Sequence, residues 1–200
     1  MSDSIVWIVD DDEAVCDSLE LLLKTVGLRA RTFPNGKSFL EGFDDGLPGC
    51  VVVDLRMPGM SGLELQEALH RKHSTVPIIF ITGHGTVDSA VHAMRAGAID
   101  FLQKPFDDQE LLDTIQRAIR LDRESRESLS GREQLVERYS TLTNREREVM
   151  ALVVEGHANK VMAYDLGVSE RTIEIHRSRA MKKMEAKSLP HLVRMALDLK

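Results

Sequence analysis

Residues 50–62 read CVVVDLRMPGMSG, an apolar run that ends in a carboxylate and leads into a turn containing Pro and Gly. A short, continuous run of Val is typical of a strand that is buried on both faces of a parallel sheet. We therefore expect Asp54 at the carboxyl end of a central strand. Further apolar runs predict strands at 5–9, 28–33, 78–82 and 99–102.

Amphipathic segments alternate with these strands. Apolar residues recur at helical spacing over 15–26, 87–94 and 111–119. We assign the apolar stripe of 87–94 to the core. Strands that alternate with helices indicate a doubly wound α/β domain. If the strand order is 2-1-3-4-5, the first and third strands are neighbours, and ligands bind beyond their carboxyl ends.

Charge divides the chain into two parts. The 200 residues have a net charge of −6, but residues 1–122 contain 11 basic and 20 acidic residues, whereas 123–200 contain 15 and 12. An acidic part joined to a basic part suggests two domains, of which the second faces a polyanion. The charged stretch at 122–140 is poor in core residues and is interpreted as a helical linker. The two domains are therefore placed at 1–121 and 141–200.

The sequence also argues against several classes of protein. It has no apolar run that approaches the length of roughly 20 residues that a membrane-spanning helix needs. The N-terminus lacks the pattern of a secretory leader. Cys16 and Cys50 are the only cysteines, and they lack the CxxC spacing of a zinc site. We therefore expect a cytoplasmic protein with two reduced thiols.

The second domain contains no candidate strand and is predicted to be an all-α domain of four helices. Thr143 and Glu146 form a capping box that begins the first helix. Gly167 makes a tight turn between the second and third helices, and Ser169 caps the third. Two helices joined by such a turn, the second of them basic, form the helix-turn-helix pattern. The second to fourth helices are expected at 159–166, from Ser169 to about Lys183, and at 189–199.

The strongest chemical signal is a set of carboxylates at strand ends. Asp10 and Asp11 end the first strand, and Asp54 ends the third. Like charges that meet at one edge of a sheet repel unless a cation intervenes, and oxygen ligands suit Mg²⁺ or Mn²⁺. Thr82 ends the fourth strand and Lys104 follows the fifth. A carboxylate nucleophile beside a metal, a hydroxyl and an ammonium suits phosphoryl transfer to Asp54.

These residues resemble a known family. The segments VDDD (9–12), VVVDLRMPGMSG (51–62), ITGHG (81–85) and DFLQKPF (100–106) are similar to the receiver domain of two-component response regulators, in the form of the FixJ branch. The resemblance covers about residues 4–120 and implies a flavodoxin-like five-stranded sheet. It implies that Asp54 accepts a phosphoryl group from a sensor histidine kinase. The receiver would slowly hydrolyse this aspartyl phosphate without being a dedicated enzyme.

The resemblance also implies a metal site. Asp11 would bind Mg²⁺ directly and Asp10 would act through water. Asp54 and the backbone carbonyl of Arg56 would complete the protein ligands.

A switch is implied as well. Thr82 and Phe101 would form the switching pair, and Lys104 would pair with the phosphoryl group. Pro105 would belong to the switch, after a cis peptide bond. The outer side of the helix at 87–94, together with the fifth strand, would form a homodimer face after phosphorylation.

The third helix of the second domain has one apolar and one basic face. Ile173 and Ala180 are expected to face the core. An outward Ile175 suits a thymine methyl, and Glu174 suits the N4 amino group of cytosine. The basic residues would mainly bind phosphates. The candidate DNA contacts are Arg171, Thr172, Glu174, Ile175, Ser178, Arg179 and Lys182.

Residues 140–197 resemble the LuxR-type helix-turn-helix of the FixJ and NarL regulators, which implies binding to double-stranded promoter DNA. Val161 is a departure, because many members have an acidic residue there. We therefore predict a DNA-binding transcriptional regulator of a two-component system. Phosphorylation of Asp54 would promote dimerisation and promoter binding.

Two alternatives are weighed against this function. A free-standing phosphatase of the haloacid-dehalogenase type needs a second Asp two residues after the nucleophile, where this chain has Arg56. A receiver joined to a protein- or RNA-binding helical module is the second alternative. Salt-dependent binding to duplex DNA distinguishes it from the DNA-binding function.

Overall fold

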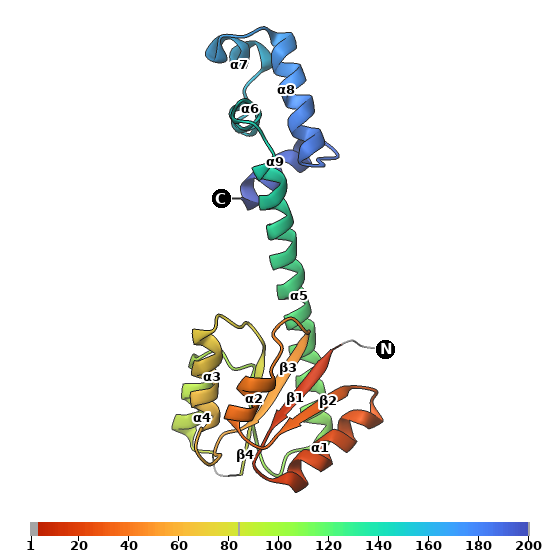
Figure 1. Cartoon of the computed structure of the whole chain (residues 1–200), viewed down its shortest axis with the longest axis vertical. Coiled ribbons are helices and arrows are strands. Elements are labelled where there is room, and N and C mark those ends of the chain that lie inside the picture. The colour runs from red at the N-terminus through yellow and green to blue at the C-terminus, as the bar shows by residue number, and fades with distance from the viewer. Residues whose placement is uncertain (1–3, 84, 200) are drawn as a thin grey trace. The chain divides into compact units, whose positions relative to one another are not determined.

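The computed structural model describes residues 4–83 and 85–199, and the chain divides into two compact units, Met1–Arg126 and Glu127–Lys200. The first unit contains a five-stranded sheet with helices (Figure 1). Its strands are β1 (Ile5–Val9), β2 (Arg29–Phe33), β3 (Gly49–Asp54), β4 (Ile78–Thr82) and β5 (Asp100–Gln103). Its helices are α1 (Glu13–Thr25), α2 (Gly36–Gly42), α3 (Gly62–Arg71), α4 (Val87–Arg95) and the first part of α5 (Asp108–Ser140).

The sheet is parallel, and the predicted strand order is confirmed as β2-β1-β3-β4-β5. Every residue of β1, β3 and β4 is buried, as the continuous apolar runs of β3 and β4 predict for those two strands. Val9 pairs with Val53, so the residues that follow β1 lie beside Asp54 at the end of β3. The register thus brings the ends of β1 and β3 to the same point of the sheet edge.

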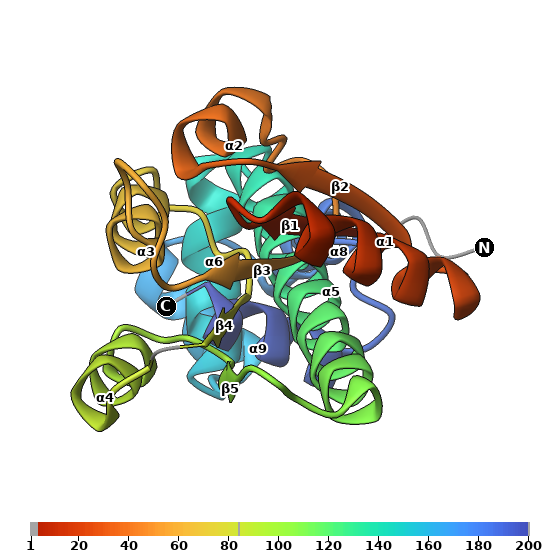
Figure 2. The ribbon, with the colours of Figure 1, turned by 90° about the horizontal axis from the view of Figure 1, so that it is seen from below.

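Helices cover both faces of this sheet. Figure 2 shows α1 and α5 on one side and α3 and α4 on the other. Ile8 and Ile79 pack in the core cluster that contains Leu111 of α5. Trp7 and Phe80 pack in the cluster on the opposite face. The alternation of side chains along each buried strand therefore divides the apolar residues between two helical layers.

The interpretation of the apolar stripe of α4 as core is wrong. Val87, Val91 and Met94 are 80%, 43% and 45% exposed. The buried residue of α4 is Ala93, and the helix packs against β5. Helical periodicity identifies two faces, but it does not show which one the fold covers. Here the face with small residues is covered, so the larger apolar side chains face solvent.

The second unit is all-α in its described residues. Its core contains Val149, Met162, Ile173 and Leu192, one from each of its four short helices. Gly167 adopts φ 64° at the end of α7, where a left-handed conformation favours Gly. The predicted caps are also present, at Thr143 before α6 and at Ser169 before α8. The short helices are α6 (Asn144–Val154), α7 (Asn159–Leu166), α8 (Glu170–Lys183) and α9 (Leu189–Asp198).

Helix α5 is continuous through the charged stretch at 122–140. Asp122 is buried, and its Oδ2 accepts hydrogen bonds from the backbone N–H of Gly49 at 2.9 Å and from Nε of Arg126 at 2.7 Å. The first residues of this stretch are therefore anchored in the first unit. In the described part of the chain, no helix has both the length and the apolar character needed to cross a membrane.

Candidate functional site

Two carboxylates and one ammonium group meet at the edge of the sheet. Asp54 ends β3 and is 7% exposed, and Asp10 follows β1 and is 2% exposed. Nζ of Lys104 donates to Oδ2 of Asp10 at 2.6 Å and to Oδ1 of Asp54 at 2.9 Å. Backbone amides bind the remaining oxygens: Arg56 N donates to Oδ2 of Asp54 at 2.6 Å, and Asp12 N donates to Oδ1 of Asp10 at 3.0 Å. The two acids are therefore held in place from both sides.

Charge is balanced only in part at this site. Burial by itself would lower the pKa of Lys104, but hydrogen bonds to Asp10 and Asp54 outweigh it, so the pKa lies above its usual value. Lys104 is therefore charged at neutral pH. With both acids ionised, two negative charges share one positive charge, so the site attracts a further cation.

The predicted third carboxylate has a different environment. The side chain of Asp11 is exposed, whereas that of the preceding Asp10 is buried. Strand β1 ends at Val9, and the chain bends at Asp11, so Asp11 lies where the chain leaves the buried sheet. Over 4–83 and 85–199, no group of three His, Cys, Asp or Glu side chains is placed to hold a metal ion. The structure thus brings together two of the three expected acids.

The oxygen atoms at this edge are nevertheless suitable for Mg²⁺. Carboxylate oxygens and a backbone carbonyl are hard ligands, and Mg²⁺ retains several waters, so it needs few protein ligands. Asp10 and Asp54 already converge on one cationic nitrogen. Asp11 follows Asp10 in the chain, and Arg56 lies two residues after Asp54. The donor set therefore fits the predicted ion.

The expected switch residues lie around a small glycine. Thr82 ends β4 and is 1% exposed, and its backbone carbonyl accepts from Lys104 N at 2.8 Å. Phe101 is half-buried on β5. A Cβ atom at Gly85 would lie 2.6 Å from the Phe101 ring and 2.7 Å from Cγ2 of Thr82. The absence of a side chain at Gly85 therefore leaves room for the side chains of Thr82 and Phe101, which both lie against this position. Pro105 follows the predicted cis peptide bond, which is present.

A second glycine sets the path of the chain after Asp54. Gly62 begins α3, and its N–H donates to the carbonyl of Leu55 at 3.0 Å. A Cβ atom at position 62 would lie only 2.5 Å from the carbonyl oxygen of Asp54. The absence of a side chain therefore permits α3 to start against the end of β3. The sequence shows a glycine at position 62, but it does not show the close contact with the carbonyl of Asp54 that requires one.

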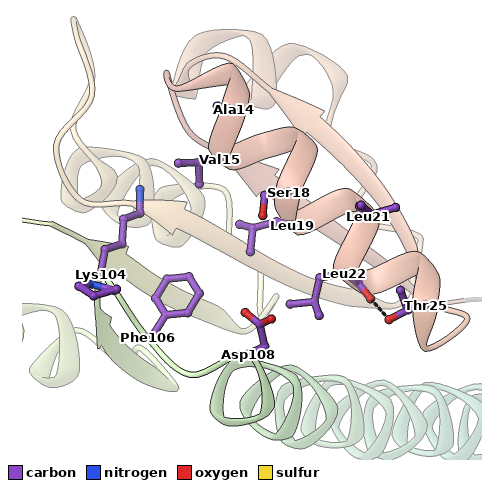
Figure 3. A pocket seen from close by; sticks show the side chains of 11 residues that line it. Ala14, Val15, Ser18, Leu19, Leu21, Leu22, Thr25, Lys104, Phe106 and Asp108 are labelled. Atoms are coloured by element: carbon purple, nitrogen blue, oxygen red, sulfur yellow. Dashed lines mark hydrogen bonds between the residues drawn. The ribbon is translucent and has the colours of Figure 1, made fainter.

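A groove of about 610 Å³ lies beside the acidic site, between α1 and the segment that joins β5 to α5 (Figure 3). Val15 and Leu22 of α1 line it from one side. Lys104, Phe106 and Asp108 line it from the other. Leu21 adds apolar surface that is 65% exposed. Lys104 thus belongs both to the acidic site and to the wall of this groove.

The basic helix α8 presents most of the predicted DNA contacts to solvent. Ile175 is 43% exposed and lies in a shallow hollow of about 430 Å³. Thr172 is half-buried, and its hydroxyl lies 2.8 Å from that of the cap residue Ser169. Arg177 donates to Oδ1 of Asn159 on α7 at 3.3 Å and so has a structural contact. The exposed candidates are Arg171, Glu174, Ile175, Ser178, Arg179 and Lys182.

One partly buried ion pair contributes to this unit and was not predicted. Nζ of Lys183 on α8 donates to Oε2 of Glu146 at 2.6 Å, and the same oxygen accepts from Thr143 N at 2.8 Å. Burial would raise the pKa of Glu146, but the hydrogen bonds from Lys183 and Thr143 outweigh it, so the pKa lies below its usual value. The capping box thus also joins the start of α6 to the end of α8.

Comparisons with known proteins match both units. Residues 6–116 match the response regulator receiver domain, and residues 140–196 match the luxR family of bacterial regulatory proteins. FixJ of Rhizobium meliloti is 46% identical over 98% of this chain and 97% of its own. TodT of Pseudomonas putida F1 is 41% identical over 100% of this chain and 89% of its own.

Solved structures show the same relationship. The response regulator StyR is 42% identical to this chain in sequence. Its solved structure matches with a TM-score of 0.91, over 98% of this chain and 99% of the StyR chain. Full-length FixJ from B. japonicum is 40% identical, has a TM-score of 0.61 and covers 100% of this chain and 98% of its own. The similarity therefore extends over both units.

Proposed function

Because this chain belongs to the two-component response regulators, with a receiver domain and a LuxR-type DNA-binding domain, we propose that phosphorylation of Asp54 controls its binding to promoter DNA. The family makes it a transcriptional regulator rather than a dedicated enzyme. The LuxR-type match also favours DNA over a protein or RNA as the target of α8. The observation that supports Asp54 most directly is that Lys104 donates hydrogen bonds to both Asp54 and Asp10.

Asp54 is the nucleophile in this proposal. A carboxylate oxygen attacks the phosphorus of a phosphohistidine on the sensor kinase, an O–P bond forms and the N–P bond breaks. The imidazole nitrogen of the kinase retains the electron pair and takes a proton. Lys104 and the N–H of Arg56 lie within hydrogen-bond distance of the Asp54 oxygens, so they are placed to offset negative charge there.

A divalent cation completes this arrangement. Asp10, Asp11, Asp54 and the carbonyl of Arg56 would hold Mg²⁺ or Mn²⁺. The ion supplies positive charge beside the oxygens of the phosphoryl group. Its binding also offsets the charge that Lys104 leaves unbalanced between Asp10 and Asp54.

The sensor kinase must bring its histidine to Asp54, so it must contact the surface around the site. The groove of Figure 3 provides apolar surface there, from Val15, Leu22 and Phe106. Leu21 extends this surface on α1. We therefore assign the groove to the kinase.

The exposed stripe of α4 supports a homodimer through α4 and β5. Val87, Val91 and Met94 present large apolar side chains that their own chain leaves exposed. In the proposed switch Thr82 moves toward the phosphoryl oxygens, Phe101 follows, and the α4–β5 face becomes complementary to a second copy. A nearly complete switch requires a shift of roughly 5 kcal/mol in the equilibrium. The dimer then presents two α8 helices to half-sites related by two-fold symmetry.

The test compares the wild-type chain with Asp54→Asn. Both are treated with radiolabelled acetyl phosphate and used for footprinting on genomic DNA with and without that donor. We expect Asp54→Asn to lose the label and the donor-dependent footprint, whereas the exposed control Asp113→Asn keeps both. An acyl phosphate that persists in Asp54→Asn would place the nucleophile elsewhere.

A further inference from the structure

Gln66 on α3 is a buried polar side chain, 2% exposed, that takes no part in the proposed phosphoryl transfer. Its Nε2 donates to the backbone carbonyl of Ala96 at 3.0 Å and to that of Ala93 at 3.4 Å. Both partners are acceptors, so the NH₂ group of the amide, and not its oxygen, faces α4. A buried amide is costly without partners. These two hydrogen bonds therefore determine where the end of α4 lies against α3.

The two carbonyls belong to the last turn of α4. The final carbonyls of a helix have no partner within the helix itself. Gly97 follows the helix with φ 87°, and the N–H of Ala98 donates to the carbonyl of Ala93 at 3.0 Å. A turn of this kind, with a left-handed glycine, is a common helix ending. Gln66 adds a donor from a second helix, so it fixes this ending to α3.

The two ends of α4 are held differently. At the C-terminal end, Ala93 is buried and Gln66 supplies two hydrogen bonds. At the N-terminal end, Val87 is 80% exposed. The switch pair lies against Gly85, two residues before Val87. A movement of the switch pair therefore acts on the more exposed end of the helix, while the other end is held by α3.

We propose that Gln66 is a positioning residue of the switch, which fixes the C-terminal end of α4 so that the helix turns about that end when the receiver is phosphorylated. A fixed end converts a small displacement at Gly85 into a rotation of the exposed apolar stripe of α4. A helix without this fixed end would occupy several positions, so a smaller fraction of the molecules would be complementary to a second copy. The proposal rests on the proposed function, because phosphorylation must first displace the switch pair.

Gln66→Met tests this role in the full-length chain, because Met has a similar length but no hydrogen-bond donor. Amide exchange, followed by NMR without a phosphoryl donor, should be about tenfold faster at Ala96 and Ala98 in the variant, because their turn opens more often. Acetyl phosphate with Mg²⁺ should then shift the amide signals of Ala90 and Val91 in both proteins. It should shift those of Ala96 and Ala98 in the variant alone.

Dimerisation provides the functional readout. Light scattering in the presence of acetyl phosphate and Mg²⁺ gives the dissociation constant of the donor-induced dimer. We expect this constant to rise about fivefold in Gln66→Met, because fewer molecules present the stripe of α4 correctly. The label taken from radiolabelled acetyl phosphate should stay within about twofold of wild type, since the acidic site keeps all its residues.

Two controls separate this role from a general loss of stability. Cys50 is buried in the core cluster that α4 does not join, so Cys50→Ala weakens the receiver from the opposite face of the sheet. Gln116 is an exposed glutamine of α5, so Gln116→Met makes the same chemical change elsewhere. Both controls should keep the wild-type exchange at Ala98 and the wild-type dissociation constant of the dimer.

Several results would overturn the proposal. Equal exchange in wild type and Gln66→Met would show that the amide does not hold this end of α4. A labelled wild-type chain in which both ends of α4 respond alike, or neither responds, would exclude a fixed end. Faster exchange with unchanged dimerisation would leave Gln66 a structural contact only, and the same changes in Cys50→Ala would assign them to lost stability. A wild-type chain that takes no label or forms no dimer would instead refute the proposed function, and this role of Gln66 with it.

Discussion

Replacement of Lys104 by Met tests the electrostatic account of the receiver site. Met has a similar length and no charge, so Lys104→Met removes the only cation that contacts both Asp10 and Asp54 among the described side-chain ion pairs. Both carboxylates stay buried and lose a hydrogen-bond donor. The folded receiver should therefore be destabilised relative to the unfolded chain, where water solvates the acids.

The size of the effect follows from burial. Removing one partner of a buried ion pair costs about 3–5 kcal/mol. The Lys104 side chain is 23% exposed, so solvent screens part of the interaction and we expect about 2–3 kcal/mol. With a urea dependence of about 2 kcal/mol per molar, the midpoint of unfolding should fall by roughly 1–1.5 M. Because the pKa of Lys104 is raised on folding, its contribution is fully present below its ordinary value of 10.5. It is lost only as the pH rises through the higher pKa of the folded state.

Trp7 provides the assay. It is the single Trp of the chain and lies fully buried in β1, so its fluorescence reports the unfolding of the receiver. Urea titrations of Lys104→Met should show the lower midpoint at neutral and moderately alkaline pH. Lys24→Met, at an exposed position of α1, should unfold like wild type. Added Mg²⁺ should restore part of the lost stability, because it replaces the missing positive charge.

Two results would refute this reasoning. If Lys104→Met and wild type unfold at the same urea concentration without Mg²⁺, Lys104 does not balance the two acids. If the variant is destabilised but Mg²⁺ has no effect, the charge balance stands and the proposed metal site does not.

Three other substitutions give distinct outcomes. Glu146→Gln should lower the thermal stability of the DNA-binding domain, because it weakens the contact with Lys183; the loss should be about 1–3 kcal/mol in thermal scans at neutral pH. Because the pKa of Glu146 is lowered on folding, its contribution to stability is present above its usual value of 4.5 and disappears as the pH falls through the lower folded-state pKa. A stability difference between wild type and Glu146→Gln that grows in acid would contradict the assignment. Val91→Asp should leave labelling by acetyl phosphate unchanged but abolish donor-induced dimers in light scattering, whereas persistent dimers would exclude α4 from the interface. Gly85→Ala should displace the Phe101 ring and alter donor-dependent DNA affinity more than phosphorylation; equal donor dependence in both proteins would separate this glycine from the switch.

Much of the fold follows from local sequence patterns. The Val and Ile runs of β3 and β4 predict strands buried on both faces, and those strands are fully buried. The capping box of Thr143 and the turn at Gly167 mark helix ends that the structure confirms. These signals are reliable because each depends on residues close together in the chain.

Contacts between distant residues were harder to predict. Helical periodicity in α4 could not show that Ala93, rather than the larger Val91, faces the sheet. Adjacency of Asp10 and Asp11 suggested a paired site, but only Asp10 is buried. The contact of Lys183 with Glu146 joins residues 37 positions apart, and no local pattern indicates it.

The hydrogen bond between Gly49 and Asp122 offers a spectroscopic handle on the receiver. It joins residues 73 positions apart, and the donor is a single buried amide at the start of β3. A side chain at position 49 would collide with the carbonyl of Ile5, so this strand can begin only with glycine here. Glycine amides often resonate in a sparsely populated part of a nitrogen–proton spectrum. The chemical shift of the Gly49 amide therefore reports whether the carboxylate of Asp122 on α5 still accepts this hydrogen bond.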